Sequence, residues 1–320
     1  MPVETCAGCR FDGADVTTTD ATRSVRTAAT RWRHHLEGIG LDALTARTAG
    51  RWSAVDHLAR DRDLTAAMAD VLAAMAGDAP PVARLDLPDP PAAEEPVGVV
   101  IETLDEAAAR LVEAVAGFGR DGWRRTATVD GVEVDAAWVL RHAAHAAEHH
   151  PLLAGRALRD AGAGAPTATG SVAQVSVNRG GVPKEPVPSA RIGRRGLAGD
   201  RQATRRLHGT TWQAVCLWSL ERIDALRAEG HEVFPGATGE NLTVAGLDWS
   251  TVRPGVQLRA GGALLAVTAY ATPCHQNARW FLRGDPMRMR HERHPGWSRV
   301  YATVLEDGEV RTGDPVVVEP

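Results

Sequence analysis

The chain has 320 residues, of which 44% are hydrophobic and 24% charged, and its formal net charge is −4. Such a length allows two domains, each with a core of its own. No apolar run approaches the roughly 20 residues of a membrane-spanning helix, and the first residues lack the basic and then apolar order of a signal peptide. We therefore expect a cytoplasmic protein with no membrane partner. Its four scattered cysteines do not form a disulfide framework.

Charge differs between the two halves of the chain. Residues 171–320 contain 19 Lys and Arg against 15 Asp and Glu, whereas residues 1–170 contain 17 against 25. A basic half without a dense basic run fits a small anionic ligand better than a nucleic acid. Lys184 is the only lysine in the sequence, which marks it as a candidate, although chance survival in an arginine-rich sequence explains it equally well.

The first half has the periodicity of helices, with apolar residues three and four positions apart. Asp20 and Ser53 stand where helix N-caps are expected, and the proline-rich segment 78–96 is predicted to be irregular. After an N-terminal segment, 1–19, we expect residues 20–160 to form an antiparallel four-helix bundle. Its helices are predicted at 20–38, 52–77, 103–118 and 134–158.

Small residues at 161–170 have the composition of a linker, and beyond them the periodicity becomes that of strands. One helix at 219–230, with Ser219 as its N-cap, interrupts the strands. Many short strands separated by glycine turns are typical of a closed barrel, so residues 171–320 are expected to form a mainly β domain with a few helices. The strands are predicted at 171–177, 213–219, 240–246, 256–261, 263–270, 299–305 and 314–320.

Chemically distinctive side chains gather in this second half. The stretch "TPCHQNARW" places Cys274 after a proline, at the end of a predicted strand. A thiol accompanied by cations and by amides on turns can bind an oxyanion while it offers one soft sulfur ligand. The accompanying candidates are Lys184, Arg201, His208, Asn241, Thr272, Asn277 and Arg299.

The motifs "GLAGDRQ", "PGATGENLTVAGLDW" and "TAYATPC", in this order, resemble the MOSC domain, the C-terminal family of molybdenum cofactor sulfurases. The resemblance covers residues 171–320 and implies a β-barrel that binds a molybdenum-pterin cofactor, with Cys274 as the metal ligand. At the level of the family it also implies pyridoxal phosphate binding. The seven accompanying candidates are then the residues that line the pocket for the pterin and its phosphate.

Three functions remain open under this resemblance. The first is an oxidoreductase that reduces N-hydroxylated small molecules at a molybdenum bound by Cys274. Its electrons must come from a separate donor protein, because the sequence has neither a G-x-G-x-x-G fingerprint nor a Walker loop. The second is a persulfide relay on Cys274, loaded by a sulfur donor. The third is a non-catalytic carrier, in which the barrel holds the cofactor and the bundle docks a partner.

Several residues of the second half receive a structural interpretation. Cys216 lies in the apolar run "AVCLWSL" and is expected to be a core thiol. His275, His291 and His294 are interpreted as surface or rim groups. Thr210 stands where relatives within the resembled family often have a second glycine after the histidine, and a side chain there can narrow the pocket.

A second candidate site lies in "RHAAHAAEHH". His145 and His149 are four residues apart and therefore on one helix face, which is the spacing of metal ligands. With "RWSAVDHLARDRD" upstream, residues 20–160 resemble the DinB-like bundle family, which implies zinc or nickel held by three histidines. Arg60 occupies the place of the second-helix histidine, so His57, one turn earlier, is the expected third ligand. The alternative is a bundle without a metal.

Cys6 and Cys9 form a single CxxC motif near the start of the chain. Without a second CxxC this motif is a weak zinc signal. It fits half of a mixed metal site completed by His145 and His149, a redox pair, or a frayed end without a role.

Overall fold

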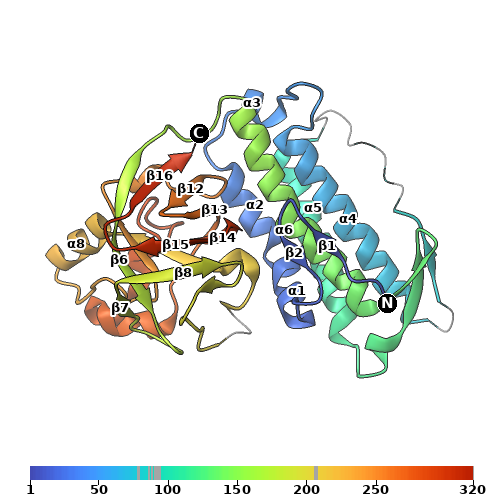
Figure 1. Cartoon of the computed structure of the whole chain (residues 1–320). Helices are drawn as coiled ribbons and strands as arrows, with labels where there is room; N and C mark the ends of the chain where they lie inside the picture. Colours follow the sequence, from blue (N-terminus) through green and yellow to red (C-terminus); the bar gives the residue numbers. More distant parts are fainter. Residues whose placement is uncertain (78–79, 86, 88, 90–94, 205–207, 320) are drawn as a thin grey trace. The chain divides into compact units, whose positions relative to one another are not determined.

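The computed structural model describes residues 1–77, 80–85, 87, 89, 95–204 and 208–319. They divide into two compact units, Met1–Ala163 and Gly164–Pro320 (Figure 1). Much of the segment predicted to be irregular, 78–96, lies outside the described residues. None of the described helices is both long and apolar enough to cross a bilayer.

The first unit is the predicted four-helix bundle, with its first helix interrupted. α1 (Thr18–Arg26) ends at Thr27, where α2 (Ala28–Leu36) begins. The Thr27 hydroxyl donates back to the carbonyl of Arg23 at 2.9 Å, a bond that tends to bend helices. After the short α3 (Leu41–Thr45), the remaining helices of the bundle are α4 (Ala54–Ala74), α5 (Val97–Ala116) and α6 (Ala136–Asp160), and α4 packs against both of the others.

Side chains cap α1, α4 and α6, and one of the two caps predicted in this unit is confirmed. Ser53 accepts a hydrogen bond from the backbone N–H of Asp56, and the Asp56 carboxylate accepts from that of Ser53, which completes a capping box. The prediction that Asp20 caps α1 was wrong. The N-cap is Thr17, and Asp20 lies three residues later as the reciprocal member of a second capping box.

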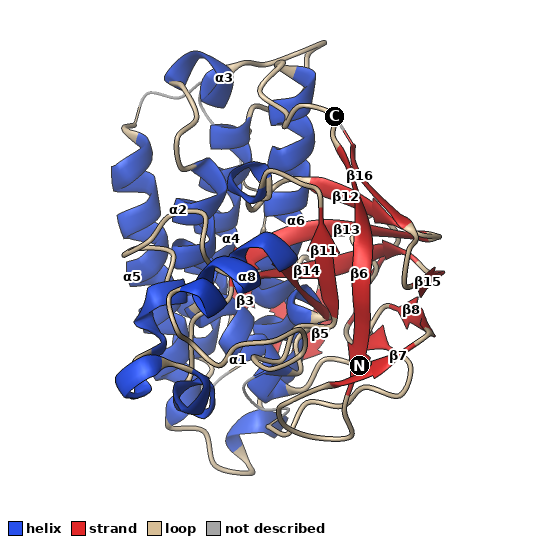
Figure 2. Ribbon diagram, turned by 90° about the vertical axis from the view of Figure 1, so that its left-hand side faces the viewer, coloured by secondary structure: helices blue, strands red, loops and turns tan. Residues whose placement is uncertain are grey.

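Seven strands of the second unit close into a barrel, which Figure 2 shows in red. Their order is β11–β10–β14–β13–β12–β16–β6, and β6 pairs back with β11. Each overlaps a predicted strand, which confirms the expected barrel. The strands are β6 (Thr169–Val177), β10 (Val215–Ser219), β11 (Leu242–Ala245), β12 (Gln257–Ala260), β13 (Ala263–Tyr270), β14 (Val300–Glu306) and β16 (Pro315–Glu319).

Shorter elements complete the two units, and most were not predicted because two to five residues carry too little periodicity. The helix α8 (Leu220–Ala228) was predicted, and Ser219 caps it as expected. The remaining strands are β1 (Thr5–Cys6), β2 (Phe11–Asp12), β3 (Val82–Ala83), β4 (Thr126–Val129), β5 (Val132–Asp135), β7 (Glu185–Val187), β8 (Ser189–Gly193), β9 (Gly196–Leu197) and β15 (Gly308–Arg311). The 3₁₀ turns are η1 (Gly122–Arg124), η2 (Thr211–Gln213), η3 (Trp249–Thr251), η4 (His275–Trp280), η5 (Leu282–Gly284) and η6 (Pro286–Met289).

Gly236 allows two loops of the barrel unit to pack closely against each other. Gly236 has φ +89°, and a Cβ built on it would lie 2.4 Å from the carbonyl oxygen of Lys184. The same two segments are joined by a hydrogen bond from the Lys184 N–H to the Gly236 carbonyl at 2.9 Å. Only glycine permits both this φ and this approach of two backbones. The contact holds the loop that contains Lys184 against the 235–239 turn, where the candidate site is built.

Candidate functional site in the barrel unit

A cavity of about 200 Å³ lies among the loops of the second unit. Its walls come from segments far apart in the sequence, namely 181–184, 200–204, 238–241 and 272–277, with Arg299 just before β14 and Tyr301 on that strand. All eight residues predicted for the barrel site line this one cavity. They are Lys184, Arg201, His208, Asn241, Thr272, Cys274, Asn277 and Arg299.

Cys274 is held in the cavity wall by its neighbour Asn277. The thiol is half-buried, and the side-chain oxygen of Asn277 accepts the backbone N–H of Cys274 at 3.1 Å. The Cys274 Sγ lies 3.5 Å from the same oxygen. The Asn277 amide donates in turn to the carbonyl of Thr238 at 3.1 Å. The buried Asn277 therefore orients the thiol rather than offering a free amide to a ligand.

Arg299 brings a buried positive charge to the same wall. Its side chain is only 5% exposed, and its guanidinium donates to the Thr238 carbonyl and, at 3.4 Å, to Asn277 Oδ1. Its Nε is buried and has no hydrogen-bond partner among the described residues. Burial opposes this charge, but Cys216, Tyr301 and other neighbours outweigh it and raise the pKa of Arg299. A buried cation with an unused donor in a cavity suits an anionic ligand.

Lys184 has a different environment. Its ammonium is 2.6 Å from the Asp200 carboxylate, and both side chains are nearly buried. The Asn241 amide donates to the same carboxylate at 2.9 Å and to the carbonyl of Ser176, while its oxygen accepts the N–H of Cys216. Lys184 and Asn241 thus form part of a closed polar network. Their polar atoms build the cavity wall, and the lysine charge is already compensated.

The remaining candidates lie at the cavity with less constraint. Arg201 and Thr272 are exposed. His208 is half-buried, and its Nδ1 lies 3.5 Å from the hydroxyl of Tyr301. Thr210 is not among the described lining residues, because its buried hydroxyl donates to Gln213 at 2.8 Å. The Thr210 side chain therefore contacts Gln213, a lining residue, instead of occupying the cavity itself.

Two of the structural interpretations can now be compared with the fold. Cys216 is buried on β10, and burial raises the pKa of its thiol to about 11, which agrees with a core role although its side chain also reaches the cavity wall. The assignment of His291 to the surface was wrong. Its ring is buried and stacks on Tyr270, with ring centroids 3.5 Å apart.

Glu240 and Thr238, which are not among the predicted site residues, support the wall of the cavity. The carboxylate of Glu240, fully buried, accepts the N–H of Gly236 at 2.6 Å and the hydroxyl of Thr238 at 2.9 Å. Thr238 then presents its carbonyl to both Asn277 and Arg299. The motif "PGATGEN" contains the signal, because a glutamate directly after a glycine turn is placed to accept the N–H groups of that turn.

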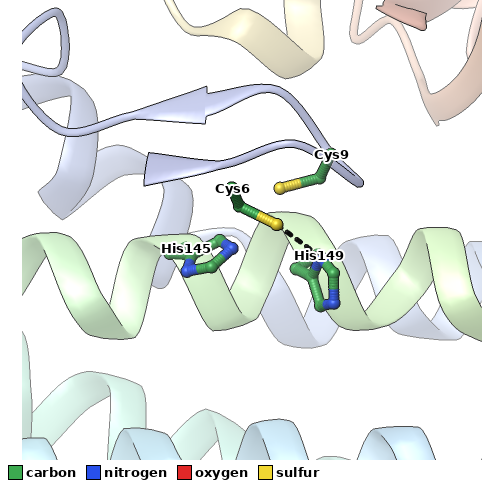
Figure 3. A group of neighbouring side chains, drawn as sticks. All are labelled: Cys6, Cys9, His145 and His149. Atoms are coloured by element: carbon green, nitrogen blue, oxygen red, sulfur yellow. Dashed lines mark hydrogen bonds between the residues drawn. The ribbon is translucent and has the colours of Figure 1, made fainter. Parts of the chain in front are cut away.

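The first unit assembles a separate group of side chains, drawn in Figure 3. Cys6, Cys9, His145 and His149 each direct one ligand atom into a common space, and these four atoms all lie within 4.8 Å of one another. The two cysteines come from the hairpin of β1 and β2, and the two histidines from α6. The structure thus brings together four of the five residues predicted for a metal in this half.

His57, the fifth, is not part of that group. Its Nδ1 lies 3.3 Å from the Nδ1 of His150, and both rings are buried. Burial, with a further contribution from His149, lowers the pKa of His57 to about 4. Arg60, where the resemblance to the DinB-like bundle implied a histidine, lies over the ring of Trp52 at 5.0 Å and donates to the carbonyl of Leu87. The described residues therefore contain no cluster built from His57, His145 and His149 alone.

Residues 204–317 match the family model of the MOSC domain, and the chain therefore contains a MOSC domain in its second unit. Among curated proteins it is similar to YflK of Bacillus subtilis strain 168, with 33% identity over 135 residues, and to YiiM of Escherichia coli strain K12, with 32% over 127. The two alignments cover 42% and 38% of this chain. They span 60% and 55% of the length of those relatives.

Among solved structures the chain is similar to YiiM from Geobacillus stearothermophilus, with 24% identity and a TM-score of 0.39. That alignment covers 48% of this chain and 76% of the other. It is also similar to YfiT from Bacillus subtilis, a four-helix bundle of unusual topology, with 12% identity and a TM-score of 0.41. This second alignment covers 51% of this chain and 93% of the other.

Proposed function

We propose that the second unit binds a molybdenum-pterin cofactor through Cys274 and reduces N-hydroxylated small molecules. One observation carries the proposal. A single cavity contains a half-buried thiol and a buried guanidinium, that of Arg299, whose Nε has no hydrogen-bond partner in the described part of the chain. This donor set fits the cofactor, because a thiolate is a soft metal ligand and a pterin phosphate needs charge-assisted donors. The MOSC domain is of the type that binds this cofactor.

The residues of the chain have distinct roles in this proposal. Cys274 is the metal ligand, and Asn277 fixes its direction through the hydrogen bond to its backbone. Arg299, from inside, and Arg201, from the exposed side, bind the anionic part of the cofactor. Lys184, paired with Asp200, positions the wall instead of binding the phosphate directly.

The proposed reaction converts an N–OH group to N–H and water, and it consumes two electrons and two protons. The chemistry that the bound cofactor supplies is removal of the substrate oxygen with two-electron transfer. The electrons come from a separate donor protein. His208, which lines the cavity beside the hydroxyl of Tyr301, would deliver a proton to the substrate oxygen in this proposal.

The test is elemental analysis with pterin fluorescence on protein from a host that makes molybdenum cofactor. We expect about one molybdenum per chain in the wild type and in Cys216→Ala, and none in Cys274→Ala. Cys216 is the matched control, because it is a thiol in the same cavity wall that is buried and protonated. Loaded protein should then reduce an N-hydroxylated base with a chemical electron donor. Equal molybdenum in wild type and Cys274→Ala contradicts the proposal.

The same samples separate the other two functions. If the wild type contains no molybdenum, a mass increment of one sulfur on Cys274 after incubation with a desulfurase favours the persulfide relay. If the wild type holds the cofactor and passes it intact to a partner without any turnover, the barrel is a carrier. Each function implies its own partner: an electron donor for the reductase, a sulfur donor for the persulfide relay, and a protein that docks on the bundle for the carrier.

A further inference from the structure

We infer that Cys6, Cys9, His145 and His149 form a closed, structural zinc centre that fastens the N-terminal hairpin to α6. This inference concerns the first unit and is independent of the function proposed for the barrel. It also differs from the three-histidine site that the bundle's resemblance implied, because His57 is replaced by two thiols from the hairpin.

The geometry of the four ligand atoms fits a tetrahedral zinc ion. In such a centre, with Zn–S near 2.3 Å and Zn–N near 2.0–2.1 Å, the ligand atoms are about 3.4–3.8 Å apart. The four atoms here lie within 4.8 Å of one another, and Cys6 Sγ is 3.7 Å from His149 Nδ1. Small side-chain movements therefore suffice to close the shell around an ion.

His145 supplies an independent observation that points to a ligand. Its Nε2 is buried and has no hydrogen-bond partner in the described part of the chain. Its other nitrogen, Nδ1, lies 2.5 Å from the carboxylate of Glu4, which also contacts His142. A carboxylate on the far nitrogen is how zinc-ligating histidines are usually oriented. Phe11 stacks on the same ring, with centroids 4.8 Å apart, and so restrains it further.

The hairpin supplies the two sulfur ligands, Cys6 from β1 and Cys9 from the turn that follows it. Zinc binding releases the thiol protons to solvent, and two thiolates then neutralise the charge of Zn²⁺. Two sulfur and two imidazole ligands are a set that structural zinc commonly takes.

The role of the centre follows from its coordination. Four protein ligands leave no position for water or substrate, so the ion is structural and not catalytic. Strands β1 and β2 have two residues each, and a hairpin of this size is marginal by itself. Cys9 and Phe11 pack into the same core cluster as α6 residues. A zinc ion would fasten this short hairpin where packing alone is weak.

The experiment uses the full-length chain, purified without added metal, and measures zinc, nickel and iron together. We expect about one zinc per chain in the wild type and in Cys274→Ser, the matched thiol control in the other unit, and loss of zinc in Cys6→Ser and His149→Asn. Zinc retained in both ligand variants, or absent from the wild type, overturns the inference. Because Cys274→Ser keeps its zinc, failure here and failure of the molybdenum proposal are distinguishable.

A second measurement avoids variants that fail to fold. Trypsin releases Met1–Arg10, which contains both cysteines of the site and neither of the others. Under native conditions we expect both thiols to resist alkylation until a zinc chelator is added, as judged by the mass of this peptide. Cobalt in place of zinc should show the absorption of a tetrahedral thiolate site. A disulfide within the peptide, or full alkylation without chelator, rejects the centre and leaves the redox interpretation.

Discussion

At the scale of single residues, Asp61 is the most unusual carboxylate in the helical unit. Its side chain is fully buried on α4, and its Oδ2 accepts the indole N–H of Trp32 at 2.6 Å. Its Oδ1 has no hydrogen-bond partner among the described residues. Burial raises the pKa of Asp61 to about 6, although Trp32 and Arg31 counteract part of that effect. The folded unit therefore binds this proton more tightly than the unfolded chain does.

A pH dependence of stability follows from this raised pKa. Since the unfolded value is near 3.9, stability is gained as pH falls from above 6 towards 4, and is lost as pH rises through 6. The shift of roughly two units corresponds to about 3 kcal/mol. We predict that the free energy of unfolding of wild type relative to Asp61→Asn changes by about this amount between pH 7 and pH 4. Urea unfolding followed by far-UV circular dichroism measures it.

We compare how the two unfolding free energies change with pH, and not their absolute values, because the amide of Asp61→Asn adds a difference that does not depend on pH. Asp70, an exposed carboxylate on the same helix that pairs with Arg110, serves as the control. Asp70→Asn should leave the pH dependence close to that of the wild type. If the difference in unfolding free energy between wild type and Asp61→Asn stays constant across the pH range, the raised pKa of Asp61 is ruled out.

The residues of the barrel site show how much of a site can be predicted from residue types alone. Lys184 was singled out because it is the only lysine, and the resemblance to the MOSC domain implied its place at the cavity. Its pairing with Asp200, 16 residues later, followed from no pattern in the sequence. In the function we propose, Arg299 and Arg201 supply the charge for anion binding, because the charge of Lys184 is compensated by Asp200.

At the scale of elements, the start of α1 shows which of two residues, Thr17 or Asp20, is the N-cap. The Thr17 hydroxyl accepts the N–H of Asp20 at 3.1 Å, and the Asp20 carboxylate accepts the N–H of Thr17 at 3.3 Å. Thr17 is exposed, so a change there tests the cap without disturbing the core. The run "VTTTD" offers several residues of capping type, which is why composition alone misplaced the helix start by three residues.

We predict that Thr17→Ala lowers the free energy of unfolding of the helical unit by about 1 kcal/mol, whereas Thr17→Asn changes it by only a few tenths. Asn can still accept the bond from the third helical residue. Thermal or urea unfolding monitored by far-UV circular dichroism provides the measurement. Equal stabilities of the Ala and Asn variants argue against Thr17 as the cap.

At the scale of the whole molecule, the barrel closes entirely within one unit. Its first strand begins at Thr169 and its last ends at Glu319, and these two strands pair with each other. The helical unit has two core clusters of its own. We propose that residues 161–170 form the connection between two domains, 20–160 and 171–320, with 1–19 as the segment that carries the CxxC. The last two residues of this connection, Thr169 and Gly170, already belong to β6.

This division predicts that residues 164–320 fold when expressed alone. We expect the melting temperature of the isolated barrel to lie within about 3 °C of its transition in the full-length protein, which is about 1 kcal/mol for a domain of this size. Differential scanning calorimetry of both proteins makes the comparison. A zinc chelator should lower the melting temperature of the helical unit, whose transition is missing from the isolated barrel, and leave the transition of the barrel unchanged. An isolated barrel that is aggregated or without a cooperative transition refutes independent folding.

The sequence alone determined the helices of the bundle, the seven barrel strands and eight of the residues that line the cavity. Periodicity and motif order are local properties, and each of these features is encoded within a short stretch. Only the tertiary structure decided which distant groups meet. It paired Cys6 and Cys9 with His145 and His149, and His57 with His150. Such partners are separated by 93 residues or more, and burial and packing select them, which no local pattern records.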